Sequence, residues 1–458
     1  MKKNLFIIAG LVCSSLLQAQ TLDPYFLNPE NNVFTIINAN GGNGVVKPND
    51  LDFNPLTINS PMELWVINEG TENTGGKTVT FYDAGEVSQT FKVKQDGNAW
   101  HFMSLPSGMA FSETGDWANS PNVFSANHNT TPFTGPSLWS SDMTVYAVNH
   151  GPGTNGSHLD MLHQSPYSLG IASDTQNVFW VNDAYNQNIV RYDFALDHGP
   201  GNDFHGDGKV HFYKEIRTAA RPAGLPGLPS HLVMDKSDKT LYICDNANSR
   251  IIRMDSRSAT KKADLNFNLE NLAERWEMEN TNWGVINANV VAPTGIDVYG
   301  DRLVVTDNST GEFIFFNIAD TSNIYETGRI AVDYAPHNIR GVKVGPDGKI
   351  WFVDYGSNKV YRIDNPSVWG IGVNEHSVEV PFEVYPNPGS DFVNVMVPEN
   401  FEGSIEILAA NGQKVAEHSV HDFTNRIDVS QGKKGLYIIQ LISKQGAIVG
   451  RQKWLKSN

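Results

Sequence analysis

The chain has 458 residues, of which 40% are hydrophobic and 18% charged, a composition typical of a folded protein with room for more than one domain. Its formal net charge is −16, and removal of a leader carrying Lys2 and Lys3 takes away two positive charges and leaves −18. Such an acidic surface repels phosphate, which argues against nucleic-acid binding, whereas it favours solubility and cation binding.

The first twenty residues have the pattern of a secretory signal peptide. Lys2 and Lys3 give a basic start, an apolar stretch runs from Leu5 to Leu17, and Ala19 supplies a small residue for cleavage. No later apolar run is long enough to cross a membrane as a helix. We therefore expect export by the Sec machinery, removal of residues 1–20 and no transmembrane segment in the mature chain.

A single cysteine, Cys244, remains after cleavage because Cys13 lies in the leader. Cys244 stands in an apolar run and is expected to be a buried hydrophobic residue. The exported protein is therefore expected to fold without an internal disulfide.

Short strands are expected in the first part of the mature chain. Residues 33–38 form one strand, and 62–68 pair with 78–83 across a longer turn. Residues 105–111 and 143–148 indicate another pair. Between them, residues 112–141 are rich in Ser, Asn, Thr, Pro and Gly and predict a long surface loop.

One unit then repeats four times between residues 166 and 364. In each copy a strand begins just after a proline, and a hairpin follows whose first strand ends in Asp. These aspartates are Asp183, Asp245, Asp307 and Asp354, and each precedes the polar end of the second strand by ten positions. An Asp at a strand end is best explained as a cap of the following turn. The copy after Asp245 carries an insertion, residues 256–283, in which 268–276 are compatible with a short amphipathic helix.

A repeat of this length, with short strands and Gly/Asp turns, is typical of a β-propeller blade, because one blade cannot bury both faces of its sheet alone. Residues 166–364 resemble the NHL and related six-bladed propellers. The fold class predicted is all-β, with a six-bladed β-propeller over residues 21–364 whose last blade is completed by the strand at 33–38. A seventh blade stays open if residues 84–160 hide a degenerate one.

The pattern stops at Asp364, and residues 365–379 read as a linker. Residues 380–458 resemble the C-terminal sorting domain of type IX secretion cargo. The residues that carry this resemblance are Tyr385, Pro386, Asn387, Pro388, Asp391, an Asn411-Gly412 hairpin, Gly435 and Tyr437. The resemblance implies a small β-sandwich, recognised by the type IX outer-membrane translocon and usually removed. It also implies a protein that is secreted or held on the outer cell surface after crossing the periplasm of a Gram-negative bacterium. The alternative is a carbohydrate-binding or adhesion sandwich, which the low number of aromatic residues disfavours.

Three histidines stand near the starts of predicted inner strands, where a propeller has the mouth of its channel: His163, His231 and His337. Three imidazoles that converge could hold zinc or a similar ion, whereas single histidines in loops are more often hydrogen-bonded structural groups. Pro336-His337 is similar to the Pro-His that binds zinc in the peptidyl-hydroxyglycine amidating lyase family. Tyr167 and Thr294 stand where that family has its other histidines, which puts the lyase activity in doubt.

A second metal hypothesis concerns the Gly/Asp-rich segment 197–208. Asp203 and Asp207, followed by Gly208, are spaced like the first half of a calcium loop. The twelfth position is Lys214, so the segment is not an EF-hand, and a solvated loop is the competing interpretation.

Two classes of function remain. The first is an exported recognition module that binds a peptide, a glycan or a surface partner. The second is a metal-assisted lyase or hydrolase with its site at the channel mouth. The sequence assigns no catalytic residue and names no extracellular ligand.

Overall fold

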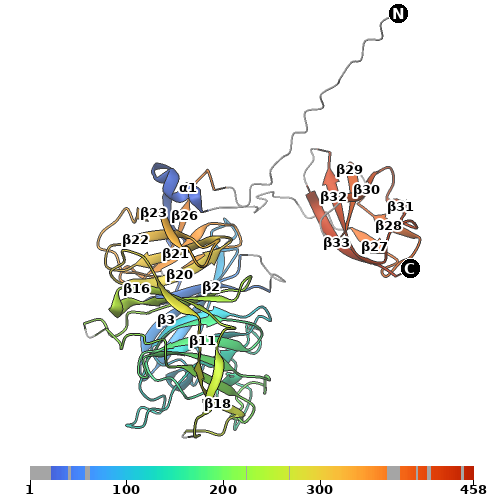
Figure 1. The fold of residues 1–458 in the computed structure, drawn as a ribbon. Coiled ribbons are helices and arrows are strands. Elements are labelled where there is room, and N and C mark those ends of the chain that lie inside the picture. Colours follow the sequence, from blue (N-terminus) through green and yellow to red (C-terminus); the bar gives the residue numbers. More distant parts are fainter. Residues whose placement is uncertain are drawn as a thin grey trace, which may run out of the picture. The chain divides into compact units, whose positions relative to one another are not determined.

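The computed structural model describes residues 22–39, 43–56, 62–222, 224–267, 269–368, 382–398, 401–409, 414–444 and 448–457. The chain divides into two compact units, residues 1–371 and 372–458 (Figure 1). Strands dominate the described residues, whose α-helices are the short α1 (Asp23–Leu27) and α2 (Ala99–Phe102). The predicted all-β fold class is confirmed. None of the described helices is long and apolar enough to span a membrane. The predicted signal peptide and most of the predicted linker lie outside the described residues.

The larger unit consists of six sheets that follow one another along the chain. In each, the chain runs from an inner strand outward, and every pair of consecutive strands is antiparallel. The first three sheets begin with β2 (Pro48–Phe53), β3 (Leu64–Thr71), β4 (Gly75–Tyr82) and β5 (Thr90–Lys94); then β6 (Pro106–Phe111), β7 (Trp117–Pro121), β8 (Ser137–Trp139) and β9 (Asp160–Met161); then β10 (Ser168–Ser173), β11 (Val178–Asp183), β12 (Asn188–Asp193) and β13 (Lys209–Tyr213). The last three contain β14 (Leu232–Asp235), β15 (Thr240–Asp245), β16 (Arg250–Asp255) and β19 (Trp283–Ile286); then β20 (Pro293–Tyr299), β21 (Arg302–Asp307), β22 (Glu312–Asn317) and β23 (Tyr325–Ala331); then β24 (Ile339–Val344), β25 (Ile350–Asp354), β26 (Lys359–Asp364) and β1 (Val33–Ile36). Together they form the predicted propeller.

The first strand of the chain closes the ring. β1 pairs with β26 from Val33 opposite Asp364 to Ile36 opposite Tyr361, so the last sheet takes its fourth strand from the N-terminal region. Tyr25, in α1, is fully buried and donates its hydroxyl hydrogen to the Ile363 carbonyl oxygen at 3.0 Å. The expected role of residues 33–38 is confirmed by this pairing.

Three of the four repeated aspartates cap their turns as predicted, whereas Asp245 accepts the N–H of Ala219 from another loop at 2.9 Å. The Asp183 carboxylate accepts the backbone N–H groups of Tyr185 (3.0 Å) and Asn186 (2.8 Å). Asp307 and Asp354 make equivalent bonds to Ser309 and Ser357. These carboxylates are buried, so the hydrogen bonds both stabilise the turn and supply the donors that a buried carboxylate needs.

The second sheet corrects two expectations. Residues 112–141 are not one long loop, because they contain β7 and β8. Residues 143–148 do not form a strand but a turn, in which the Tyr146 N–H bonds to the Asp142 carbonyl at 2.8 Å. β7 is fully buried despite its polar composition, because Asn119 donates to the Phe102 carbonyl (3.2 Å) and accepts from the Trp139 indole. A prediction from residue polarity cannot detect buried polar side chains that are paired in the folded protein.

The insertion at 256–283 is also different from its prediction. It forms the hairpin β17 (Thr260–Asp264) and β18 (Glu274–Glu279), and the expected helix at 268–276 is wrong for its described residues. β18 pairs in parallel with β13, so the insertion extends the sheet of the preceding blade to six strands. An unpaired edge of a neighbouring sheet decided the conformation here.

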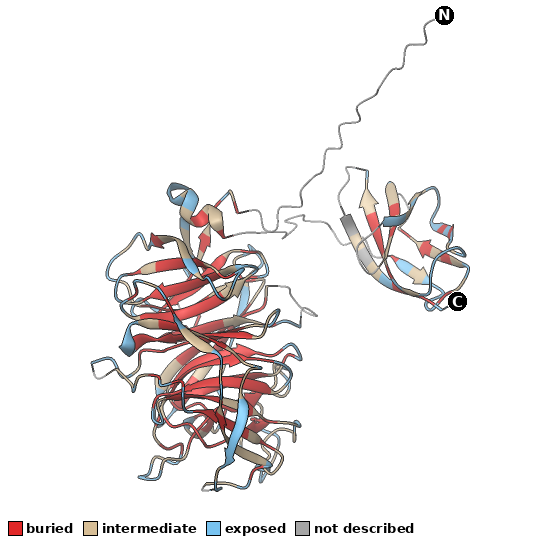
Figure 2. Cartoon of the chain, in the orientation of Figure 1, coloured by how far each residue is buried: buried red, intermediate tan, exposed pale blue. Residues whose placement is uncertain are grey.

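Apolar side chains fill the spaces between successive sheets. Figure 2 shows that the strands of the larger unit consist largely of buried residues. Between the first two sheets an aromatic group packs with ring centroids 5.3–5.9 Å apart; it comprises Trp65, Trp117, Trp139 and Tyr146. Cys244 is fully buried, as expected. Every sheet therefore depends on both neighbours, which is why the ring must close.

The smaller unit is a two-layer sandwich. One sheet has the order β27 (Glu383–Tyr385), β28 (Phe392–Met396) and β31 (Thr424–Asp428). The other has the order β30 (Lys414–Ser419), β29 (Gly403–Ala409), β32 (Gly435–Ser443) and β33 (Ile448–Lys456). Alternate residues of both layers form its core, among them Val395, Ile407 and Trp454. The predicted Asn411-Gly412 turn lies outside the described residues.

Candidate functional site

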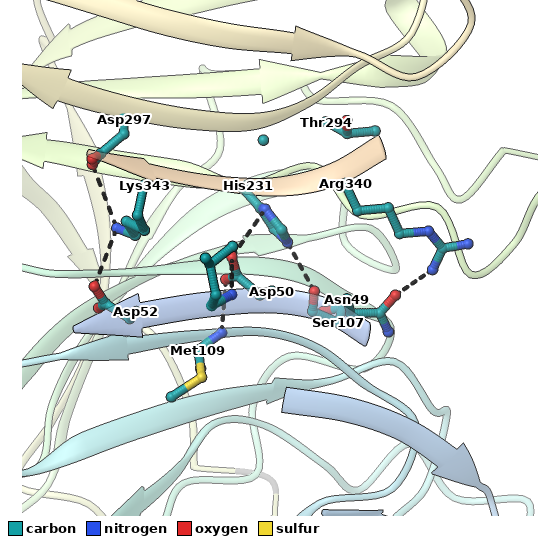
Figure 3. A network of polar contacts seen from close by, with 12 residues as sticks. Asn49, Asp50, Asp52, Ser107, Met109, His231, Thr294, Asp297, Arg340 and Lys343 are labelled. Carbon is teal, nitrogen blue, oxygen red and sulfur yellow. Dashed lines mark hydrogen bonds and ion pairs between the residues drawn. The ribbon is translucent and has the colours of Figure 1, made fainter. Parts of the chain in front are cut away.

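A polar network lies along the axis of the propeller (Figure 3). Its charged groups come from the inner strands β2, β20 and β24 and from His231, which directly precedes β14. Asp50, His231 and Arg340 are each less than 5% exposed. Buried charges are tolerated only when they are paired or hydrogen-bonded, so the partners of each group reveal its role.

Asp50 and His231 form the centre of this network. The Asp50 carboxylate accepts the N–H of Met109 at 3.0 Å and lies 3.6 Å from Nδ1 of His231. His231 Nε2 lies 2.9 Å from the Ser107 carbonyl oxygen, to which it can only donate. Burial raises the pKa of Asp50, and the electrostatic effect of the nearby His231 partly opposes this rise. The centre thus ties three inner strands together.

One end of the network is a lysine between two carboxylates. Lys343 Nζ lies 3.5 Å from Asp297 and 3.8 Å from Asp52. Burial alone would lower the pKa of Lys343, but the two carboxylates outweigh it and the pKa is raised. Each carboxylate also accepts a backbone N–H, that of Phe111 for Asp52 and that of Val344 for Asp297. The lysine is therefore held charged. A cavity of about 430 Å³ opens beside it, lined also by residues 232–237.

The other end is closed by Arg340. Its guanidinium carbon lies 3.4 Å from the centroid of the Tyr355 ring, its Nη1 donates to the Gly227 carbonyl at 3.0 Å, and Asn49 accepts a further bond. Glu69 lies 3.8 Å away and also accepts the Tyr355 hydroxyl hydrogen at 2.9 Å. Burial lowers the pKa of Arg340 to about 10, which leaves it positive at neutral pH. Stacking on Tyr355 and these hydrogen bonds hold the Arg340 side chain in place at the axis.

The predicted histidine triad is not assembled at the channel mouth. His231 commits Nε2 to Ser107, and the ring of His337 packs on the turn at Gly311, where an added Cβ would meet its Nε2 at 2.5 Å. His163 lies elsewhere, with Nδ1 2.7 Å from Glu270. The residues at the axis do not fit a zinc ion of the amidating-lyase type. Sequence spacing placed the three histidines near strand starts correctly but could not give their side-chain directions.

The predicted calcium loop is also not assembled by its acidic residues. Asp207 accepts the His198 Nε2–H at 2.9 Å and the N–H of Leu196 at 3.3 Å, so it fastens its own loop. Asp203 is exposed. The competing interpretation, a solvated loop with internal bonds, describes these two residues better.

A depression lined by arginines lies between the third and fourth sheets. Its volume is about 690 Å³, and its lining comes from the β11–β12 turn, the β13–β14 loop and the β15–β16 turn. We call it the arginine depression; its polar lining residues are Gln187, Arg217, Thr218, Arg221, Asn248 and Arg250. Sequence reasoning missed this site, because Arg250 meets Arg217 and Arg221 only when two adjacent blades fold together.

The arginine depression is largely preformed. Arg250 donates through Nε to Asp245 at 2.8 Å and through Nη2 to the Arg217 carbonyl. The Arg221 guanidinium lies 3.6 Å above the ring of Tyr167, next to the 45% exposed ring of Tyr185. The Thr218 hydroxyl is buried and has no hydrogen-bond partner. The fixed guanidinium groups can donate hydrogen bonds to an acceptor group of a ligand.

The predicted sorting motif forms one structural feature in the smaller unit. Asn387 donates to the Lys453 carbonyl at 2.8 Å and accepts the Leu455 N–H at 3.0 Å. The Pro386 carbonyl accepts the Trp454 indole hydrogen, and the Tyr437 hydroxyl donates to the Lys433 carbonyl, both at 2.7 Å. The turn 385–388 is thereby fastened to the last strand.

The C-terminal region also matches a known family model. Residues 383–455 match the model described as secretion system C-terminal sorting domain. This region is a sorting domain. It indicates handling by the type IX translocon and export to the cell surface or beyond it. A search of curated proteins finds no match for the chain.

Solved structures match this chain at low similarity. An auxiliary nutrient binding protein from Bacteroides ovatus has 12% identity and a TM-score of 0.46, over 73% of this chain and 76% of that one. The luciferin-regenerating enzyme has 12% identity and a TM-score of 0.45, over 74% and 97%. A catalytically inactive virginiamycin B lyase from Staphylococcus aureus has 11% identity and a TM-score of 0.41, over 85% and 100%. Similarity at this level carries no argument about ligand or activity.

Proposed function

We propose that this protein is an exported recognition module whose propeller binds an acidic glycan in the arginine depression. The observation that carries the proposal is the gathering of Arg217, Arg221 and Arg250 around one depression in a protein whose formal net charge is −16. Arg250 is already paired with Asp245 at 2.8 Å, so Arg217 and Arg221 supply the positive charge that a ligand can bind. A carboxylate or sulfate group is the partner that this charge favours.

The chemistry of the lining supports a sugar acid. A guanidinium group binds a carboxylate or sulfate through two parallel N–H bonds, and the fixed positions of Arg221 and Arg250 reduce the entropy lost on binding. The exposed Tyr185 offers an apolar ring face beside these charges. Peptide recognition usually needs a deep apolar pocket for an anchor side chain. The apolar part of the lining consists of Ala219, Ala220, Pro222 and Ala247, which are too small to form one.

The location of the protein follows from its two export signals. We propose that residues 1–20 direct Sec export, and that the sorting domain is removed at the outer membrane with attachment of the propeller to the cell surface. A recognition module held there would collect acidic polysaccharide from the surroundings. The arginine depression belongs to the propeller, so it stays with the mature protein when the sorting domain is cleaved.

The test is binding by the purified mature chain to immobilised acidic and neutral glycans. We expect retention of uronic-acid or sulfated glycans and none of neutral ones, with weakening by salt because the contact is ionic. Arg217→Ala should weaken binding by roughly tenfold or more, the effect of losing one charge-assisted hydrogen bond of about 1.5–3 kcal/mol. Arg257→Ala, an exposed arginine in another turn, is the matched control and should bind normally. Failure to retain any acidic glycan, or full binding by Arg217→Ala, would refute the proposal.

A further inference from the structure

The cavity beside Lys343 lies at the axis of the propeller and is separate from the arginine depression. Its volume is about 430 Å³, and all six inner strands contribute to its lining. Their contributions include, in chain order, Asp52, Phe111, Ser173, Asp235, Val298 and Lys343, each from the C-terminal half of its strand. The arginine depression includes the loop that enters β14, so the two sites lie at opposite ends of the inner strands.

Three charged side chains reach this cavity from the polar network (Figure 3). The side chains of Lys343, Asp52 and Asp297 are 17%, 16% and 10% exposed, so solvent touches each of them although most of each is buried. Lys343 Nζ lies 3.5 Å from Asp297 and 3.8 Å from Asp52, whereas an N–H···O hydrogen bond spans about 2.7–3.2 Å. An ammonium group has three N–H donors, so Lys343 keeps donors for an acceptor in the cavity.

The two carboxylates also keep part of their hydrogen-bonding capacity. Asp52 accepts the N–H of Phe111 at 2.8 Å and that of Phe53 at 2.9 Å, and Asp297 accepts that of Val344 at 2.7 Å. A carboxylate has about four acceptor positions, so these bonds orient each group and leave positions for a further donor. The cavity therefore presents oriented donors and acceptors side by side.

The charges around Lys343 determine which class of ligand the cavity suits. Two carboxylates and one ammonium group leave an excess of one negative charge, which disfavours an anion. Lys343 lies between the two carboxylates and repels a second cation from the position that it occupies (Figure 3). A hydroxyl group is uncharged and both donates and accepts hydrogen bonds, so it can bond to a carboxylate and to the ammonium group at once.

The remaining lining is largely apolar, with Phe111, Val233, Met234 and Val298 among its residues. Ligand cavities commonly combine apolar walls with a few oriented polar groups in a volume of about 300–1,000 Å³. A sugar ring matches such a lining, because it has apolar C–H faces and hydroxyl groups around its edge.

We propose that the cavity beside Lys343 binds a neutral monosaccharide. Its hydroxyl groups accept a hydrogen bond from Lys343 and donate to Asp52 and Asp297, while a C–H face of the ring packs against the apolar wall. The ligand differs in charge from the acidic glycan proposed for the arginine depression, because here the positive charge is already balanced by the two carboxylates.

The experiment is a titration of the mature chain with glucose, galactose, mannose, xylose and N-acetylglucosamine, followed by ligand-observed NMR. We expect at least one of these sugars to bind saturably with a single Kd. A ligand of about twelve non-hydrogen atoms reaches a Kd on the order of 1 mM at ordinary ligand efficiency. Binding of this strength does not retain a protein on an immobilised neutral glycan, so the result is independent of the acidic-glycan test.

Two variants test the polar contacts. Asp297→Asn and Asp52→Asn keep the shape of the side chain but remove the charge of the acceptor, and each should weaken binding by roughly tenfold, the effect of losing a hydrogen bond to a charged group. Asp320→Asn removes the same charge at an exposed position and should bind normally. Arg217→Ala should also bind the sugar normally, because it lies in the other site.

A third variant tests the cavity without changing its charges. Val298 is partly exposed in the wall, and Val298→Phe fills part of the space, so it should weaken binding by a similar factor. The proposal is overturned if none of the five sugars binds the wild-type chain saturably. It is equally overturned if the folded cavity variants all bind with the wild-type Kd, or if Arg217→Ala abolishes binding.

Discussion

Asn387 bridges the 385–388 turn to the last strand of the chain, donating to the Lys453 carbonyl at 2.8 Å and accepting the Leu455 N–H at 3.0 Å. This pair of bonds spans more than sixty residues and gives a structural reason for the sorting motif. The motif fixes how the end of β33 is presented. A translocon that recognises this end would therefore depend on the turn.

Asn387→Ala should weaken the sorting domain. The change leaves a backbone donor and a backbone acceptor without their partner, at a cost of about 1–3 kcal/mol in the free energy of unfolding. We expect a lower melting temperature of the sandwich and slower export, measured as the ratio of extracellular to periplasmic protein. Gln431→Ala, an exposed residue of the same domain, is the control. If Asn387→Ala were exported at the normal rate, recognition by the translocon would not depend on this motif.

Deletion of residues 380–458 should trap the propeller in the periplasm. The sorting domain is the part of the chain that matches a secretion family, whereas the propeller closes through its own strand β1 and does not need the tail to fold. Cell fractionation and immunoblotting of the truncated and full chains would measure this. If the truncated protein reached the medium at the normal rate, export would not require the sorting domain.

Tyr25→Phe should loosen the closure of the ring. The Tyr25 hydroxyl donates to the Ile363 carbonyl at 3.0 Å and accepts the Ile350 N–H at 3.3 Å, and burial raises its pKa so that it keeps its proton. Loss of the hydroxyl leaves two buried backbone groups unpaired, which costs about 1–3 kcal/mol in the free energy of unfolding. Urea unfolding would measure the change. Leu27→Ala, at a 67% exposed position, should be nearly neutral.

Asp183 should make the stability of the propeller depend on pH. Burial raises the pKa of Asp183 to about 6, despite the bonds to Asn186 that oppose the rise. In the unfolded chain its pKa is about 4, so the folded protein holds a proton that the unfolded chain releases between these values. The stability that this proton contributes, about 3 kcal/mol for a shift of about two pH units, is complete below pH 4 and is lost as the pH rises through 6.

Urea unfolding of wild type and Asp183→Asn between pH 4 and pH 7 tests this dependence. The free energy of unfolding of the wild type, relative to the variant, should fall as the pH rises across this range. Asp333→Asn, at an exposed position, controls for the change in net charge. Parallel pH curves for wild type and Asp183→Asn would show that Asp183 titrates normally.

Local patterns in the sequence determined the repeated part of the fold. In the hairpins ending in Asp183, Asp307 and Asp354, strand, turn and cap are neighbours in the chain, so composition and spacing suffice to define them. The sorting domain could also be predicted from the sequence, because its motif consists of few residues that lie in or next to turns. The closing role of β1 followed from the general requirement that a ring of sheets bury its last edge.

Tertiary structure alone decided the inserted hairpin, the second sheet and the candidate sites. β18 is a strand because the edge of β13 offers it hydrogen bonds, and β7 is a strand because Asn119 finds buried partners; neither partner is near in sequence. The same reason explains the histidines. Spacing brought His163, His231 and His337 under consideration, but the direction of each ring depends on Glu270, Ser107 and Gly311, which lie 107, 124 and 26 residues away. A side chain takes its chemistry from its neighbours in space, and these are set by how the blades pack.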